Sequence, residues 1–151
     1  MDLKQRIIQD MKSAQKAGEK LKLSLTRLLK SDIQYKEIEK GEELSEEEIL
    51  EVLSYAAKKH RDSIEQFKRG NREDLVNQEE EELKLILEYL PQQLNQIEIE
   101  KLVEEIISEV KAEGEKDIGK VMKALMPGIK GRADGKMVKL LVTNKLKTSQ
   151  E

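Results

Sequence analysis

The chain has 151 residues, of which 39% are charged and only 3% aromatic, and its formal net charge is −3. That length allows one ordinary domain or two small ones, and a charged, aliphatic composition is typical of helix bundles. The absence of cysteine excludes disulfides, thiolate metal sites and a cysteine nucleophile, and it makes a reducing cytosol the default compartment.

The sequence contains neither a secretory signal pattern nor a membrane-spanning pattern. Its first 18 residues are amphipathic and interrupted by charge every few positions, unlike the apolar centre of a signal peptide. No uncharged apolar run approaches the roughly 18 residues that a membrane-spanning helix needs. We therefore expect a soluble, cytoplasmic protein with no membrane partner.

Two helices are predicted ahead of residue 42. Apolar residues recur at helical spacing from Leu3 onward, and Gly18 breaks this pattern. A second amphipathic helix is predicted over about 20–40, and Gly41 is placed as its C-terminal cap.

Two further helices are predicted before residue 91. The third begins at Ser45, because Glu48 follows this serine at the spacing of a capping box, and it ends at Gly70. The fourth covers about 72–90, and Pro91 stops it because proline cannot continue a helix.

The short polar connection PQQLNQ, at 91–96, is the best candidate for a domain boundary. Three more amphipathic helices follow it, and no stretch alternates with the period of two that strands require. The sequence thus predicts an all-α fold of two helical bundles, with about four helices in residues 1–91 and about three in residues 95–148.

The three helices after the boundary have recognisable starts and stops. The predicted N-caps are Asn95, Asp117 and Asp134, and the predicted stops are Gly114 and Pro127.

The segment GEKDIGK, at 114–120, fits the first seven positions of the phosphate-binding pattern GxxxxGK[ST]. Val121 stands where the pattern needs a hydroxyl, and an amphipathic helix precedes the segment instead of a strand. Both glycines are explained by a helix end followed by a helix start, so we expect no nucleotide site and no cofactor.

His60 is the only histidine, and it lies on the apolar stripe of its helix. A packed or half-buried histidine is the expected role, ahead of a catalytic base or a metal ligand. The run EEEE at 79–82 is interpreted as a solvated helix face, with a cation site as an unspecific alternative. We therefore predict no catalytic residue and no metal site.

Charge is distributed unevenly along the chain. Residues 37–51 hold eight acidic residues and one basic residue, whereas residues 120–147 hold eight basic residues and one acidic residue, a net charge of +7. The basic residues of this second segment are Lys120, Lys123, Lys130, Arg132, Lys136, Lys139, Lys145 and Lys147. On charge alone, a solvated cationic face and a surface for a polyanion are about equally good interpretations.

Two details of this basic segment favour a polyanion. Gly131 and Gly135 flank Arg132, so that the backbone can approach a partner closely or adopt a positive φ. The last helix begins beside Lys136, and a helix N-terminus attracts phosphate, although Asp134 competes for its amides.

Aromatic residues for base stacking are absent from the basic segment, so a folded RNA recognised by backbone and shape fits best. The residues predicted to contact its phosphates are Lys120, Lys123, Lys130, Arg132 and Lys136.

The stretch GKVMKALMPGIKGRADGKMVKLLV, at 119–142, resembles the C-terminal signature of the GatB/YqeY family. Three upstream stretches are similar to the same family: LTRLLKSDIQ at 25–34, KKHRDSIEQFKRGNREDLVNQEEEEL at 58–83 and EYLPQQL at 88–94. The resemblance covers nearly the whole chain at the spacing of stand-alone YqeY-like proteins.

This resemblance implies two helical bundles and a link to tRNA. In the family, the same unit forms the C-terminal portion of the B subunit of the glutamine-dependent aminoacyl-tRNA amidotransferase, where it contacts tRNA. The catalytic domain of that enzyme is separate and is not found in these 151 residues. The implied function is a non-catalytic, tRNA-binding accessory module.

Two alternatives stay open. The chain could assist tRNA-dependent amidation by docking on amidotransferase subunits, which is the source of the label carbon-nitrogen ligase with glutamine as amido-N donor. It could also be a protein-protein adaptor whose acidic first bundle recruits a basic partner.

Overall fold

A computed structural model of the protein describes the backbone of residues 1–150 and the side chains of residues 1–148. The helices of this described part are α1 (Leu3–Ala17), α2 (Lys20–Lys40), α3 (Glu46–Arg69), α4 (Glu73–Leu87), α5 (Gln96–Val110), the 3₁₀ turn η1 (Glu115–Asp117), α6 (Ile118–Ile129) and α7 (Gly135–Gln150). No strand occurs among these residues, and the prediction of an all-α fold is confirmed. None of the described helices combines the length and the apolar character that crossing a lipid bilayer needs.

Local sequence signals set several helix ends. At the start of α3, the backbone N–H of Glu48 donates to Oγ of Ser45 (3.2 Å), and the N–H of Ser45 donates to Oε1 of Glu48 (3.0 Å). These two bonds complete the predicted capping box. Gly18 and Gly41 end α1 and α2 with φ of 71° and 81°, a left-handed conformation that glycine adopts without strain.

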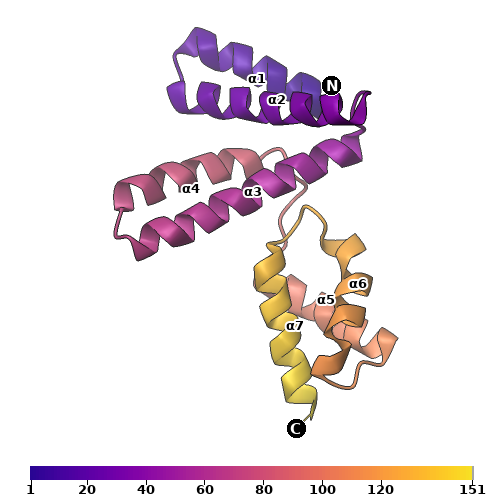
Figure 1. Ribbon diagram of the computed structural model, residues 1–151. Helices are drawn as coiled ribbons and strands as arrows, with labels where there is room; N and C mark the ends of the chain where they lie inside the picture. The colour runs from indigo at the N-terminus through magenta and orange to yellow at the C-terminus, as the bar shows by residue number, and fades with distance from the viewer. Residues whose placement is uncertain (151) are drawn as a thin grey trace. The chain divides into compact units, whose positions relative to one another are not determined.

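The chain divides into two compact units, Met1–Pro91 and Gln92–Glu151. In the first unit α1 packs against α2, and α3 packs against α4, as two helical hairpins (Figure 1). Helix α2 also contacts both α3 and α4. The core of this unit consists of Ile7, Leu25, Leu29, Ile33, Ile49, Leu53, Ala56, Ala57, Ile86, Tyr89 and Leu90.

Tyr89 connects the segment after α4 to α1. Its side chain is 6% exposed, its hydroxyl donates a hydrogen bond to the Asp10 carboxylate, and its ring lies 4.9 Å from the guanidinium carbon of Arg6. Burial and the bond to Asp10 raise the pKa of the Tyr89 hydroxyl well above its ordinary range. The hydroxyl therefore remains a donor at physiological pH.

In the second unit, α5, α6 and α7 pack against one another around a separate core. That core consists of Ile99, Val103, Val121, Leu125, Ile129, Val138, Val142 and Leu146.

The connection between α5 and α6 differs from the sequence prediction. Helix α5 ends at Val110, and Lys111 takes a left-handed conformation with φ of 55°, whereas the helix was predicted to continue to Gly114. The Asp117 carboxylate accepts a hydrogen bond from the N–H of Glu113 (2.8 Å) instead of capping α6. The 3₁₀ turn ahead of α6 accounts for this, because it places the Asp117 carboxylate over the preceding loop.

Pro127 does not end α6, in contrast to the prediction. The helix continues to Ile129, which is 3% exposed in the core, and the N–H of Lys130 still donates to the carbonyl of Met126 (3.0 Å). Proline this close to a helix end removes a single backbone hydrogen bond. The packing of Ile129 outweighs that loss.

Candidate functional site

The turn between α6 and α7 is held by the segment that begins the second unit. The carbonyl of Gly131 accepts a hydrogen bond from Nε2 of Gln93 (2.8 Å), and the carbonyl of Arg132 accepts one from the N–H of Leu94 (2.8 Å). In the opposite direction, Nε of Arg132 donates to the carbonyl of Gln92 (3.2 Å). The turn thus has a fixed conformation.

The two glycines of this turn differ in their role. Gly131 has a φ of 73°, a conformation that side chains other than glycine rarely adopt. Gly135 begins α7 with an ordinary φ, and a Cβ atom built on it would meet nothing within 4 Å. Gly131 is therefore required by the turn, whereas nothing within the described chain requires glycine at 135.

Three of the five predicted phosphate-binding residues follow one side of α6. Lys120 and Lys123 are exposed, and Lys130 is the exposed residue that caps the helix. Positions three and seven residues apart share a side of a helix. The opposite side carries the buried Val121 and Leu125. The rise of the helix places Lys130 about 15 Å from Lys120 along the axis.

The other two predicted residues lie on the turn and at the start of α7. Arg132 uses its Nε to hold Gln92, which leaves the remaining N–H donors of the guanidinium for other partners. Lys136 is exposed, and its backbone N–H donates to Oδ1 of Asp134 (3.1 Å). The Asp134 carboxylate thus competes for the α7 N-terminus as expected.

Lys145 also belongs to the basic segment, and it pairs with an acidic residue of α5. Its Nζ lies 2.7 Å from Oε1 of Glu104 in α5, and this ion pair raises the pKa of Lys145. Lys145 lies in α7 and faces α5, whereas Lys120 and Lys123 lie on the exposed side of α6. Exposed lysine and arginine side chains can bind anions such as phosphate through charge-assisted hydrogen bonds.

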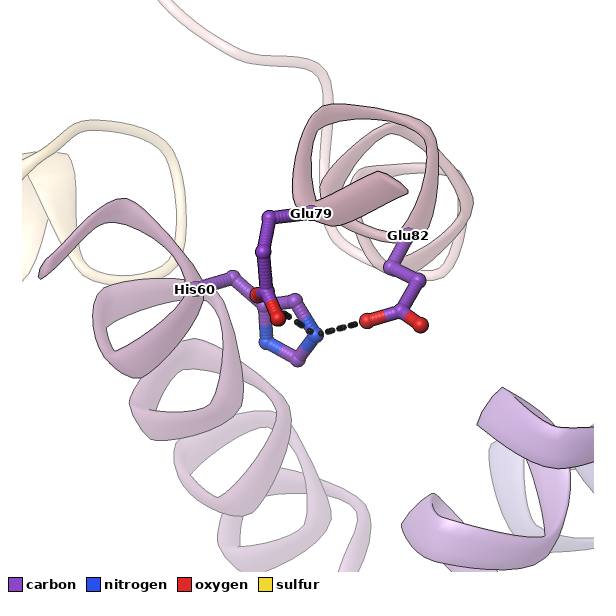
Figure 2. Close-up of side chains that lie close together, drawn as sticks. All are labelled: His60, Glu79 and Glu82. Atoms are coloured by element: carbon purple, nitrogen blue, oxygen red, sulfur yellow. Dashed lines mark hydrogen bonds and ion pairs between the residues drawn. The ribbon is translucent and has the colours of Figure 1, made fainter. Parts of the chain in front are cut away.

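A second group of polar side chains lies between α3 and α4 in the first unit (Figure 2). His60 is 8% exposed, in agreement with the expectation of a packed histidine. Its Nδ1 lies 2.9 Å from the carbonyl oxygen of Ala56, and its Nε2 lies 2.9 Å from Oε2 of Glu82 and 3.6 Å from Oε2 of Glu79. Burial raises the pKa of the Glu79 carboxyl, and the nearby imidazole acts in the opposite direction.

Sequence reasoning did not identify Glu79 and Glu82 as partners of His60. The run EEEE was expected to be a solvated face, yet the side chains of Glu79 and Glu82 are only 22% and 16% exposed. Glu80 and Glu81 do point to solvent. A signal was present in the sequence, because His60 precedes Gly70 by ten residues and the two glutamates follow it by nine and twelve. Residues equally far from the turn of a helical hairpin lie side by side.

Comparison with known proteins gives a family and several relatives. The profile of a protein family described as Yqey-like protein matches residues 4–146. A Lachancea thermotolerans protein, "Altered inheritance of mitochondria protein 41, mitochondrial", is 32% identical over 146 residues, which is 92% of this chain and 78% of that protein. Proteins of the same name are 39% identical over 82 residues in Vanderwaltozyma polyspora and 30% identical over 113 residues in Saccharomyces cerevisiae.

The matched regions differ in extent. The match with the Vanderwaltozyma protein covers 54% of this chain and 44% of that protein. The match with the Saccharomyces protein covers 72% of this chain and 61% of that protein. All three relatives are named as mitochondrial proteins. This finding contradicts the expected cytoplasmic location, and that expectation was wrong. Its basis, the absence of cysteine and the charged character of the first 18 residues, does not distinguish one reducing compartment from another.

Proposed function

Because the chain belongs to the YqeY-like protein family, we propose that it is a tRNA-binding accessory module that performs no chemistry of its own. The observation that carries this proposal is the row of Lys120, Lys123 and Lys130 on the exposed side of α6. The turn that follows this row carries Arg132, and Lys136 lies in the first turn of α7.

The dimensions of the row suit a phosphate backbone. It extends for about 15 Å along the helix, and one strand of a DNA duplex, whose phosphodiester backbone is of the same kind as that of RNA, carries a phosphate about every 3.4 Å along its axis. Several phosphates of one strand can therefore face the three lysines. No aromatic side chain interrupts the segment from 119 to 148, which favours contacts to backbone and shape over base stacking.

A titration of a tRNA transcript with the full chain at several salt concentrations tests this proposal. The triple variant Lys120→Gln, Lys123→Gln, Lys130→Gln should bind more weakly. The slope of log affinity against log salt should become shallower by about 2 to 3, since each lost phosphate contact removes roughly 0.7 to 0.9. Arg132 is kept in this variant because it also holds Gln92 in place.

A matched control removes the same charge from the first unit. Lys12, Lys16 and Lys20 are exposed, and changing all three to glutamine should leave the affinity and the salt slope close to those of the wild type. A single-stranded homopolymer of equal length should compete less well than tRNA. Equal losses in the two triple variants, or binding that does not respond to salt, would refute a phosphate surface on α6.

The resemblance of residues 119–142 to the amidotransferase B subunit supports a second candidate, assistance to tRNA-dependent amidation. In this case the full chain should change the rate at which a reconstituted glutamine-dependent amidotransferase amidates misacylated tRNA. The triple variant on α6 should lose that effect. An unchanged amidation rate with tRNA binding intact would refute the role in amidation and support tRNA binding as the function.

A further inference from the structure

Three atoms that can accept hydrogen bonds converge between α3 and α4 in the first unit: Nε2 of His60, Oε2 of Glu79 and Oε2 of Glu82. The carbonyl of Ala56 can only accept, so the Nδ1 of His60, 2.9 Å away, carries a proton and donates it. In the neutral ring this leaves a lone pair on Nε2. That lone pair faces Oε2 of Glu82 at 2.9 Å and Oε2 of Glu79 at 3.6 Å, which are acceptors as well.

Three acceptor atoms that face one another repel unless a proton or a metal ion lies between them. A proton on Nε2 is one solution, and it satisfies Glu82 well, but Glu79 then lies beyond normal hydrogen-bond distance. A metal ion is the other solution. A four-coordinate zinc ion holds its ligand atoms about 3.3 Å apart, given bond lengths near 2.0 to 2.1 Å. The distances from Nε2 of His60 to Oε2 of Glu82 (2.9 Å) and to Oε2 of Glu79 (3.6 Å) lie on either side of that value. All three ligand atoms lie within 4.8 Å of one another.

We propose that His60, Glu79 and Glu82 form a binding site for a divalent transition-metal ion of the Zn²⁺ class. One nitrogen and two carboxylate oxygens suit such an ion better than Ca²⁺ or Mg²⁺, which select oxygen ligands alone. The ligands come from two helices, as Figure 2 shows. A bound ion would therefore link α3 to α4.

The surroundings of the three ligands fit this role. A metal-binding histidine usually donates its other ring N–H to a carbonyl or carboxylate, and the contact of Nδ1 with Ala56 is of this kind. Nε2 of Gln78 donates to Oε1 of Glu82 (3.3 Å), which orients that carboxylate and leaves Oε2 toward His60. The ligand side chains are 10 to 22% exposed, so water has access to a remaining coordination position.

The single histidine allows a direct test. Full-length protein without a polyhistidine tag, labelled with ¹⁵N only in histidine, gives NMR signals from the two ring nitrogens of His60 and from no other ring. One equivalent of Zn²⁺ should shift the Nε2 resonance and leave the Nδ1 proton in place. A histidine spectrum that is identical with and without Zn²⁺ means that a proton alone occupies the site, and it overturns the proposal.

Paired variants test the two carboxylates. The double variant Glu79→Gln, Glu82→Gln keeps side-chain size and should weaken Zn²⁺ affinity at least about tenfold, because the loss even of outer-shell partners of a metal ligand typically costs about 10- to 100-fold. Its matched control is Glu80→Gln, Glu81→Gln, which removes the same charge from exposed positions of the same run.

Zn²⁺ affinity is read by competition with a chromophoric zinc indicator, and circular dichroism verifies that each variant is helical. The control should bind as the wild type does. Equal losses in both double variants would mean that the run attracts zinc only through its net charge, and unchanged affinity in both would mean that the carboxylates are not ligands. Either result refutes the site.

Discussion

The hydroxyl of Tyr89 donates a hydrogen bond to the carboxylate of Asp10, a residue 79 positions earlier in the chain. Tyr89 follows α4 and Asp10 lies in α1, so this bond connects the two ends of the first unit's sequence. It is formed at a buried ring, where water cannot replace it at little cost.

Replacing Tyr89 by phenylalanine should lower the free energy of unfolding by about 1.5 to 3 kcal/mol, the range for a hydrogen bond to a charged group. The ring stays, and with it the contact to Arg6. Urea unfolding followed by circular dichroism measures the change. Tyr55→Phe is the control, because Tyr55 is 59% exposed and its hydroxyl should be replaceable within about 0.5 kcal/mol. Similar losses in both variants would show that the bond to Asp10 contributes nothing specific.

Glu48 should contribute to the acid sensitivity of the first unit. Its hydrogen bond with Lys40 and the bond from the N–H of Ser45 lower the pKa of Glu48 to about 2. A carboxyl whose pKa is lowered by folding adds stability at pH above its unfolded value of 4.5, and this stability is lost as the pH falls toward 2. In Glu48→Gln the decline of the unfolding midpoint between pH 5 and 2 should become less steep.

The glutamine variant is informative because the amide oxygen can still complete the capping box with Ser45. The measurement is the urea midpoint at each pH, followed by tyrosine fluorescence. Glu81→Gln, at an exposed position of α4, serves as the control and should keep the wild-type decline. A wild-type decline in Glu48→Gln would mean that the bond with Lys40 does not form in solution.

Lys145 and Lys123 should behave differently in tRNA binding although both belong to the basic segment. Lys145 already pairs with Glu104, whereas Lys123 lies on the exposed side of α6. Lys123→Gln should make the salt slope shallower by about 0.7 to 0.9, and Lys145→Gln should leave it unchanged. The same titration measures both. A larger effect from Lys145 would assign the phosphate surface to α7 instead of α6.

The two glycines of α6, Gly119 and Gly128, should have the same effect on stability and different effects on tRNA binding. A Cβ at Gly119 or at Gly128 would meet nothing within 4 Å, and neither has a positive φ. Alanine at either position should therefore stabilise the second unit by up to about 1 kcal/mol. Gly119 lies one turn before Lys123 on the same side of the helix, and Gly128 lies on another side.

If a phosphate backbone approaches this side closely, Gly119→Ala should also weaken tRNA binding, and Gly128→Ala should not. Thermal unfolding by circular dichroism and the tRNA titration give the two readouts. Stabilisation without any loss of affinity in Gly119→Ala would indicate that the glycine is not used for close approach.

The helices could be predicted from sequence where a few neighbouring residues decide the structure. Ser45 and Glu48 form their capping box within four residues, and Gly41 ends α2 by its own conformation. The prediction failed at Pro127, because the packing of Ile129 in a core formed by three helices decides whether α6 continues. A local pattern carries no information about that packing.

The same limit applies to the candidate sites. The exposure of Lys120 and Lys123 follows from the helical period of α6. The contact of Arg132 with Gln92 joins residues 40 positions apart, and it depends on how the turn folds back. Likewise, the burial of His60 follows from its apolar stripe, but the choice of Glu79 and Glu82 as its partners depends on the register of α3 against α4.

The two units differ in what spectroscopy can detect. Tyr35, Tyr55, Phe67 and Tyr89 account for all aromatic side chains, and they precede residue 92, as does the only histidine. Tyrosine fluorescence and histidine resonances therefore report on Met1–Pro91, while the aliphatic core around Val121 gives no such signal. A sample judged by its tyrosine signal is known to be folded only in its first unit. A tryptophan in place of Leu140, which is 65% exposed, would give the second unit a signal of its own.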